Sequence, residues 1–352
     1  MKRIGILYDK DSKKAFLLPD QVRELTSKGI NVNITEGLGK GLGIPDTSYL
    51  SAGARIYKQY TSVIEASDII LKASAFVSGE LAHMKDKIAI TTANFLANVD
   101  MLYFMLINKV TGCEWMALTD KGKYVIFPEI EEAKAQLTMT TITQAMANGF
   151  KHKYKYPQNP KMLILNATYG AIALAKLALN AGYDVTIADN DTKYLETVKQ
   201  SLSKISKTIH ICDANYETLL AQVKDKNIYV ATTINPTDLT KLRITQESPA
   251  LMVPGSMLID MSCQNGYAFH FIKKFAKKEL EWIEIDKRFY LAPADMSELI
   301  YKTASEIISK NSVQYLIDIA KQGTVSSCLK NIINCQEGKV ISALINKKLN
   351  LY

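Results

Sequence analysis

The chain has 352 residues, of which 47% are hydrophobic and 22% are charged, and its formal net charge is +8. This length exceeds what one hydrophobic core usually organises, so two domains of an ordinary globular protein are expected. The lysines are spread along the chain without a block of about five like charges, and no apolar stretch approaches about 18 residues. The sequence therefore predicts neither a nucleic-acid-binding protein nor a membrane protein.

The cysteines and histidines give no sign of a disulfide framework or a metal site. The five cysteines are Cys113, Cys212, Cys263, Cys328 and Cys335, an odd number without a CxxC pair. Free thiols in a reducing cytoplasm are expected. The four histidines lack HxxxH and HExxH spacing, so no metal site is predicted. Charged residues interrupt the first apolar run at Asp9, which predicts a first strand and not a signal peptide.

The first third of the chain alternates predicted strands with predicted helices. Strands are predicted at 2–8, 30–35, 55–57, 67–72 and 88–91, with helices from Pro19, after Pro45 and from about Val99, and an extended segment at 113–117. This alternation is typical of a parallel α/β sheet. The glycine-rich segment GLGKGLG at 37–43 can in principle cradle a phosphate, but no helix begins directly after it. A flexible surface loop is the favoured interpretation.

A long helix is predicted over 130–147, directly after Pro128, because the segment contains neither glycine nor proline. The following residues 151–157 alternate basic and aromatic side chains, a composition that can bind nucleic acid. A solvated linker between domains is the favoured interpretation.

The central stretch Met162–Asp191 has the pattern strand, turn, helix, strand. The apolar run 162–165 suits a strand buried on both faces, and apolar residues recur at helical spacing until Gly182. The second strand, 185–188, ends at Asp189. This order is typical of a dinucleotide-binding βαβ unit, in which an acidic residue roughly 20 positions after the turn binds a ribose hydroxyl.

The turn departs from the dinucleotide fingerprint G-x-G-x-x-G/A. It has Asn166 and Thr168 at the first two glycine positions, and Ala171 fits the third. Asparagine tolerates positive φ, whereas the methyl group of Thr168 obstructs the pyrophosphate position although its hydroxyl can donate to a phosphate. Gly170 lies one position before the third glycine position of the fingerprint and can change the course of the loop. If Asp189 binds a ribose hydroxyl, its charge favours NAD over NADP. The alternative interpretation of Asp189 is a solvent-facing residue at the end of a strand, without a binding role.

The second half continues the same alternation. Helices are predicted at 195–206 and 216–223, and strands at 208–212, 228–233 and 257–262. The segment 296–315 is apolar at helical spacing, which predicts that the chain returns to pack on its first domain. The fold class is therefore α/β, with two doubly wound, Rossmann-like domains of which the dinucleotide-binding one is inserted in the other.

Four segments in collinear order carry a resemblance that covers nearly the whole chain. They are EGLGKGLGIPDTSYLSAGA at 36–54, SDIILK at 67–72, MVPGSMLIDMS at 252–262 and QEGKVISALI at 336–345. The chain resembles the alanine dehydrogenase and pyridine-nucleotide transhydrogenase family and, more distantly, lysine-forming saccharopine dehydrogenases. The resemblance implies a substrate domain at 1–128 and 293–352 and a dinucleotide-binding Rossmann domain at 129–292. It also implies a homo-oligomer.

The resemblance assigns roles to four residues of the substrate site. The family's substrate-binding arginine falls on Lys14, which offers a point charge in place of a bidentate fork. The substrate-binding lysine is kept as Lys72. The catalytic histidine falls on Asn94 and the catalytic aspartate on Gln264. Neither amide can donate or accept a proton in a reaction near neutral pH, so both can only orient the reacting group. Lys72 can act as the acid or base in their place if burial near Lys14 favours its neutral form.

The predicted cofactor is NAD. Its predicted contacts are Asn166, Thr168, Tyr169, Gly170, Asp189, Asp295 and Met296, the last two lying where the family has its N-M-P segment. The predicted function is a divergent NAD(H)-dependent oxidoreductase acting on an amino acid, imine or 2-oxo acid, without efficient alanine deamination. An imine or opine-type reductase is compatible with it. Two alternatives are a catalytically inactive descendant that binds a small ligand or a partner protein, and a non-redox enzyme on the same scaffold.

Overall fold

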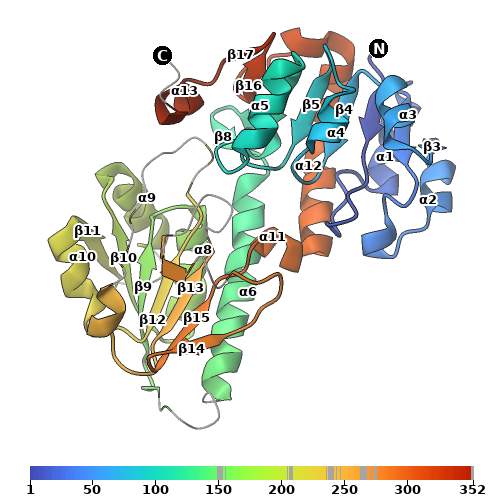
Figure 1. Ribbon diagram of the computed structural model, residues 1–352. Helices are drawn as coiled ribbons and strands as arrows, with labels where there is room; N and C mark the ends of the chain where they lie inside the picture. The colour runs from blue at the N-terminus through green and yellow to red at the C-terminus, as the bar shows by residue number, and fades with distance from the viewer. Residues whose placement is uncertain are drawn as a thin grey trace. The chain divides into compact units, whose positions relative to one another are not determined.

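The chain forms two compact units in a computed structural model (Figure 1). The structure describes residues 1–148, 154, 156–203, 205, 209–234, 236, 242, 244–245, 247–261, 268–269, 271–272 and 276–349. Unit 1 comprises Met1–Glu129 and Tyr301–Tyr352, and unit 2 comprises Ile130–Ile300. Both ends of the chain thus contribute to unit 1. The assignment of unit 1 to a substrate and of unit 2 to a dinucleotide stays a prediction.

Unit 1 is built on one eight-stranded sheet. Its strands are β1 (Ile4–Ile6), β2 (Val32–Thr35), β3 (Arg55–Tyr57), β4 (Ile69–Lys72), β5 (Ile88–Thr91), β6 (Thr111–Glu114), β16 (Ile333–Gln336) and β17 (Lys339–Val340). Their order is β17-β16-β6-β5-β4-β1-β2-β3. The strands from β6 to β3 pair in parallel, whereas β16 from the chain's last part joins β6 antiparallel. A separate hairpin pairs β7 (Thr119–Asp120) with β8 (Lys123–Tyr124).

The helices of unit 1 come from both parts of the chain. They are α1 (Pro19–Ser27), α2 (Asp46–Ser51), α3 (Tyr60–Glu65), α4 (Ser78–Leu81), α5 (Val99–Ile107), α12 (Tyr301–Gln322) and α13 (Ala343–Leu349). Helix α12 contacts α1, and its Ser305 and Ser309 hydroxyls accept hydrogen bonds from the backbone N–H groups of Ala15 and Leu18. The predicted return of the chain to its first domain is therefore confirmed. The single helix predicted over 296–315 is instead divided into α11 (Met296–Leu299) and α12.

The glycine-rich segment 37–43 is packed against its neighbours in unit 1 on one side, while Lys40 and Gly43 are exposed at the surface. Leu38 is 2% exposed, and a Cβ on Gly41 would lie 2.6 Å from the Cα of Lys13. The backbone N–H of Gly37 donates to both carboxylate oxygens of Asp46, at 3.0 and 3.1 Å. The protein's own carboxylate therefore takes the place that a phosphate would have at this N–H.

Unit 2 is a doubly wound α/β domain. Its strands are β9 (Lys161–Leu165), β10 (Asp184–Asp189), β11 (His210–Asp213), β12 (Ile228–Ala231), β13 (Met257–Asp260), β14 (Ile283–Ile285) and β15 (Arg288–Leu291), and its helices include α6 (Phe127–Ala147), α8 (Tyr169–Asn180), α9 (Thr192–Leu202) and α10 (Tyr216–Val223). The strand order is β11-β10-β9-β12-β13-β15-β14, parallel except for β14. The order reverses between β9 and β12, where ligands of such sheets bind.

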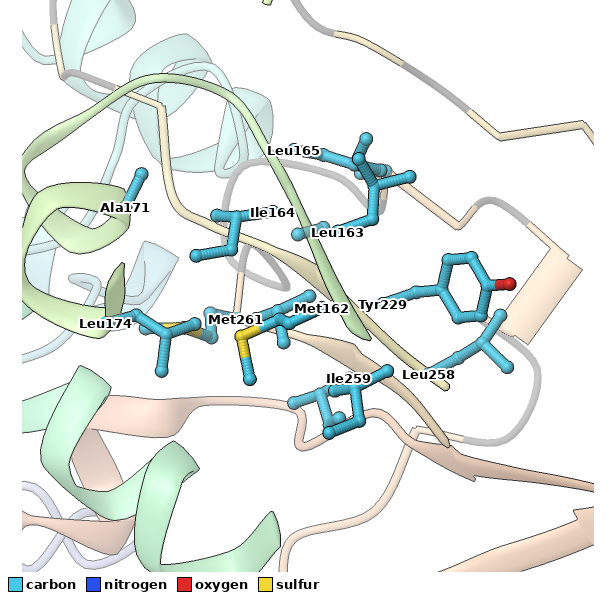
Figure 2. Close-up of a cluster of buried hydrophobic side chains, with 14 of the residues drawn as sticks. Met162, Leu163, Ile164, Leu165, Ala171, Leu174, Tyr229, Leu258, Ile259 and Met261 are labelled. Atoms are coloured by element: carbon cyan, nitrogen blue, oxygen red, sulfur yellow. The ribbon is translucent and has the colours of Figure 1, made fainter. Parts of the chain in front are cut away.

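The core of unit 2 explains why the central stretch folds as predicted. Residues Met162–Leu165 of β9 are fully buried, and Figure 2 shows them in a cluster of buried side chains that also includes Ile259 from β13 and Leu174 from α8. Because parallel strands are covered on both faces, every position of such a strand is apolar. Burial of each of these side chains contributes about 1.5–3 kcal/mol, which fixes the turn that follows β9.

Candidate functional site

The sheet of unit 1 gathers the candidate substrate residues at one edge. Asp9 follows β1, Lys72 ends β4, Asn94 follows β5 and Glu114 ends β6. These four strands are neighbours and run in parallel, so their carboxyl ends meet at the same edge. Two of the four residues, Asp9 and Glu114, were not predicted from the sequence.

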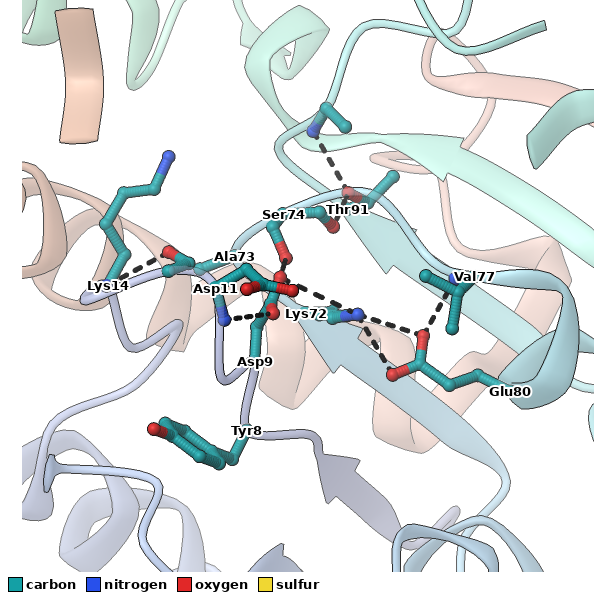
Figure 3. Close-up of polar contacts among 12 residues, drawn as sticks. Tyr8, Asp9, Asp11, Lys14, Lys72, Ala73, Ser74, Val77, Glu80 and Thr91 are labelled. Atoms are coloured by element: carbon teal, nitrogen blue, oxygen red, sulfur yellow. Dashed lines mark hydrogen bonds and ion pairs between the residues drawn. The ribbon is translucent and has the colours of Figure 1, made fainter. Parts of the chain in front are cut away.

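Lys72 is buried and paired with two carboxylates. Its Nζ lies 2.9 and 3.0 Å from the oxygens of Glu80 and 3.8 Å from Asp9, and the residue is 2% exposed (Figure 3). Glu80 belongs to the short helix α4 and also accepts a hydrogen bond from the N–H of Val77 at 2.9 Å. The ammonium group therefore has a fixed position, which suits a group that binds a substrate oxygen.

Asp9 is the second carboxylate beside Lys72. It accepts hydrogen bonds from the hydroxyl of Ser74 and from the N–H of Asp11. Burial opposes its ionisation, but these bonds and the charges of Lys72 and Lys14 outweigh burial and lower the pKa of Asp9. Both predicted substrate-binding lysines thus act on one carboxylate.

Lys14 is buried in the loop between β1 and α1. It is 6% exposed, and its backbone N–H donates to the hydroxyl of Ser12 at 3.2 Å. In Figure 3 its side chain extends away from the pair formed by Lys72 and Glu80. The side chains of Lys14 and Lys72 therefore extend in different directions.

Asn94 is fixed by hydrogen bonds within the protein. Its Nδ2 donates to Oε1 of Glu114 at 3.0 Å, and its Oδ1 accepts from the N–H of Ala97 at 3.0 Å. Glu114 also accepts from the N–H of Phe95 at 3.2 Å and from Nδ2 of Asn334 at 3.3 Å. The chain's last part, through β16, thereby helps to position the residue at the family's histidine position.

Glu114 is the titratable group of this edge. Burial raises the pKa of Glu114 to about 7, although three hydrogen bonds to its carboxylate oppose the shift. The sequence signal that could have identified it is a glutamate at the end of a buried strand, next to Trp115. An acid that titrates near neutral pH is therefore hydrogen-bonded to an asparagine that cannot titrate.

In unit 2 the turn after β9 contains a residue with positive φ. Asn166 has φ +69°, as expected of an asparagine in place of the first glycine. Its side chain donates to the carbonyl of Thr232 at 3.1 Å and accepts from the N–H of Leu242 at 3.2 Å. Thr168 is 4% exposed, and its hydroxyl lies 3.1 Å from that of Thr232. The side chains of the turn are thus directed into the protein.

Asp189 fastens this turn to the end of β10. Its carboxylate accepts from the N–H of Ala167 at 2.6 Å and from the N–H of Asp191 at 2.9 Å. Asp189 is 5% exposed, so the alternative of a solvent-facing residue was wrong. Binding of a ribose hydroxyl by Asp189 stays a prediction.

The remaining predicted cofactor residues have diverse environments. Tyr169, the first residue of α8, is 37% exposed, whereas Gly170, the second residue of this helix, is buried. Asp295 caps α11 by accepting from the N–H and the hydroxyl of Ser297 at 2.7 and 2.6 Å. Met296 is 1% exposed and belongs to the core of unit 2, so the structure shows a packing role for its side chain. Gln264 lies outside the described residues.

The residues of unit 2 fit a dinucleotide. Thr168 is the N-cap of α8, yet its side chain makes no capping hydrogen bond within the described chain. The first N–H groups of a helix without such a cap are a binding site for a phosphate. Together with the positive φ of Asn166 and the place of Asp189 at the end of β10, these N–H groups fit the layout of a Rossmann-type dinucleotide turn, and binding by these residues stays a prediction.

Two features are absent from the described residues. These residues contain no helix with the length and apolar character needed to cross a membrane. Within the same residues, no group of three His, Cys, Asp or Glu side chains is arranged to hold a metal ion.

The fold defines the class of two-domain α/β proteins with a Rossmann fold. Residues 9–127 match the model of the alanine dehydrogenase/PNT N-terminal domain, and residues 155–343 match that of the C-terminal domain. The chain belongs to the alanine dehydrogenase/PNT family. This family is NAD(H)-dependent, so the predictions of family, fold class and NAD as cofactor are confirmed at that level.

The relatives are distant but cover nearly the whole chain. An alanine dehydrogenase of Halomonas elongata is 22% identical over 87% of this chain and 84% of its own length. That of Mycolicibacterium smegmatis is 21% identical over 95% and 93%. Among solved structures, an L-alanine dehydrogenase (16% identity) has a TM-score of 0.77 over 99% of both chains, and a transhydrogenase from Sinorhizobium meliloti (17% identity) has 0.71 over 96% and 99%.

Proposed function

We propose that this chain is an NAD(H)-dependent oxidoreductase that acts on an amino acid, imine or 2-oxo acid without the proton transfer of an alanine dehydrogenase. The observation that carries the proposal is the contrast at one sheet edge. Lys72 is kept and rigidly placed, whereas the histidine position holds Asn94, whose amide is bonded to Glu114.

Lys72 and Lys14 are the substrate-binding residues in this proposal. An ammonium group has three N–H donors, and Glu80 engages Lys72 at 2.9 and 3.0 Å while Asp9 lies at 3.8 Å. A substrate carbonyl or carboxylate oxygen can accept from Lys72 in place of the more distant Asp9. Lys14 supplies a second point charge for the carboxylate, with less geometric selectivity than an arginine.

Asn94 orients the reacting group and does not exchange a proton with it. An amide offers one carbonyl and two N–H donors, and proton transfer by a general acid or base is typically worth about 10²–10⁴ in rate. The second amide, Gln264, stands where the family has its catalytic aspartate. Efficient deamination of alanine, which requires several proton transfers, is therefore not expected.

The preferred substrate class is an imine, including one formed from a 2-oxo acid and an amine. When bound, the nicotinamide ring supplies or accepts the hydride. A substrate that arrives as a charged iminium needs no proton from the protein, so a site of lysines and amides suffices for it. Lys14 and Lys72 then bind its carboxylate, and Asn94 aligns its nitrogen.

Binding and turnover assays test the proposal. We expect NADH to raise the melting temperature and to change the fluorescence of Trp115 or Trp282, the two tryptophans, and NADPH to bind more weakly. NADH oxidation is then measured with 2-oxo acids in the presence of ammonia or of amines. The absence of any response to NADH at millimolar concentration contradicts the proposal and favours a descendant without redox chemistry. Rapid L-alanine deamination contradicts the predicted substrate class.

A further inference from the structure

A buried ion pair lies at the start of the long helix α6 in unit 2. Nζ of Lys134 is 2.8 Å from Oε1 of Glu131, and the two side chains are 5% and 0% exposed. Lys134 also lies 3.5 Å from the hydroxyl of Thr233, directly after β12. Since burial of an ion pair removes two charges from water at a large desolvation cost, such a pair is weak evidence of stabilisation.

The second oxygen of Glu131 faces the dinucleotide turn. Oε2 is buried and has no hydrogen-bond partner among the described residues. It lies 2.9 Å from the place that a Cβ on Gly170 would occupy, and the side chain of Thr232 is the next contact at 3.4 Å. Gly170 is the second residue of α8, so a negative charge lies against the first turn of this helix.

The position of the pair is that of the dinucleotide crevice. The turn at Asn166–Gly170 follows β9 and Thr232–Thr233 follow β12, the two strands between which the sheet order reverses. The first turn of a helix has free N–H groups and positive potential, which attract a phosphate. The carboxylate of Glu131 reduces this potential from within the protein, and the ammonium group of Lys134 offsets it.

We infer that Glu131 and Lys134 set the affinity of unit 2 for the pyrophosphate of a dinucleotide. Glu131 is a built-in negative charge that weakens binding of the anion, and Lys134 is the cation that makes binding possible in spite of it. The inference rests on the proposed function, in which unit 2 binds NADH. It identifies two residues that determine the affinity for a dinucleotide at positions that the glycine fingerprint does not include.

Equilibrium binding of NADH to isosteric variants tests the pair. Glu131→Gln keeps an oxygen for Lys134 and removes the charge, so NADH should bind about tenfold more tightly; Lys134→Met leaves the carboxylate uncompensated, so NADH should bind about tenfold more weakly. The double variant should return close to wild type. Dissociation constants come from calorimetry, and thermal unfolding shows that each variant is folded.

Two controls separate a charge effect from a structural one. The exposed pair Glu196 and Lys199 on α9 has the same spacing in the same unit at 3.9 Å, so Glu196→Gln and Lys199→Met should leave NADH binding unchanged. Adenosine, which lacks phosphate, should bind all variants alike, whereas ADP-ribose should follow NADH.

The outcomes distinguish the inference from the proposed function. If wild type binds NADH and Glu131→Gln and Lys134→Met weaken it equally, the inference is wrong while the proposed function stands. If wild type binds no NADH, the proposed function is wrong. In that case, tight binding of NADH by the Glu131→Gln variant still supports the inference. If this variant also fails to bind NADH, the inference is wrong.

Discussion

Both units place candidate functional side chains at the carboxyl ends of parallel strands, but those around Lys72 in unit 1 are charged and those in the turn of unit 2 are uncharged. At the sheet edge of unit 1, Lys72, Asp9 and Glu80 form a charged cluster with the retained lysine at its centre. In the turn of unit 2, Asn166 and Thr168 are uncharged and bonded to Thr232. In our proposal the charged Lys72 at the edge of unit 1 binds the substrate, whereas in unit 2 the side chains of the turn form hydrogen bonds within the protein.

The largest expected effect is that of Lys72→Met. Removal of the ammonium leaves Glu80 buried without a cation, so unfolding should become easier by about 3–5 kcal/mol, and turnover of any imine or 2-oxo acid should be lost. Arg23→Met, which breaks an exposed pair with Asp20 in the same unit, should cost about 1 kcal/mol or less. Denaturant unfolding checks both, and adding Glu80→Gln should recover part of the loss. Equal costs for the two single variants would show that the buried pair of Lys72 and Glu80 contributes no more to stability than the exposed pair of Arg23 and Asp20.

The next effect is the pH dependence caused by Glu114. Its pKa in the folded protein, about 7, is raised above the ordinary value of 4.5, so its contribution to stability is complete below about pH 4.5 and is lost as the pH rises through 7. The loss amounts to about 3 kcal/mol, since one pKa unit corresponds to about 1.4 kcal/mol. Glu114→Gln should lack this dependence between pH 5 and 8.

Tryptophan fluorescence can measure this dependence in unit 1 alone. With Trp282→Phe as background, Trp115 is the remaining tryptophan and lies next to Glu114 in the chain. Denaturant unfolding at several pH values then gives the profile. Parallel profiles with and without the Glu114→Gln substitution would show that Glu114 is not the titrating group.

A smaller effect is expected from restoring the family's proton-transfer residues. Asn94→His combined with Gln264→Asp should raise L-alanine deamination by about 10² or more, since general acid–base catalysis contributes at least that factor. Each single change should give much less because the deamination of alanine requires more than one proton transfer. Steady-state NADH formation from L-alanine is the measurement. No gain in a variant that still binds NADH would mean that more than these two positions separates this site from an alanine dehydrogenase.

The smallest effect concerns the backbone of the dinucleotide turn. Asn166 has φ +69°, a conformation that costs a residue with a Cβ about 1–2 kcal/mol and glycine almost nothing. Asn166→Ala and Asn166→Gly both lose the side-chain bonds to Thr232 and Leu242, so the alanine variant should be less stable than the glycine variant by about 1 kcal/mol. Chemical denaturation compares the two. Equal stability would show that the turn changes its conformation when the asparagine is removed.

The sequence determined the framework of the protein. Apolar runs with short-range periodicity placed β9, α8 and β10, because burial on both faces of a parallel sheet demands such runs at every position. The collinear motifs identified the family, and Asn166 was expected to adopt positive φ because asparagine tolerates it. These features depend on residues that are close together in the chain, which is why they could be predicted.

Only the tertiary structure decided the partners of the site residues. Glu80 contacts Lys72 because of the loop that connects β4 to α4. Asn334 contacts Glu114 because β16, from the last part of the chain, joins the sheet beside β6. Glu131 lies close to Gly170 because α6 packs against the turn. Burial then gives these carboxylates their importance, since a charge or an unpaired oxygen matters most where water is excluded. No local pattern encodes which distant side chain fills a given place in a packed interior. The sequence thus proposed Lys72 and Asn94 as candidate site residues, and only the fold showed that Glu80 and Glu114 are their hydrogen-bond partners.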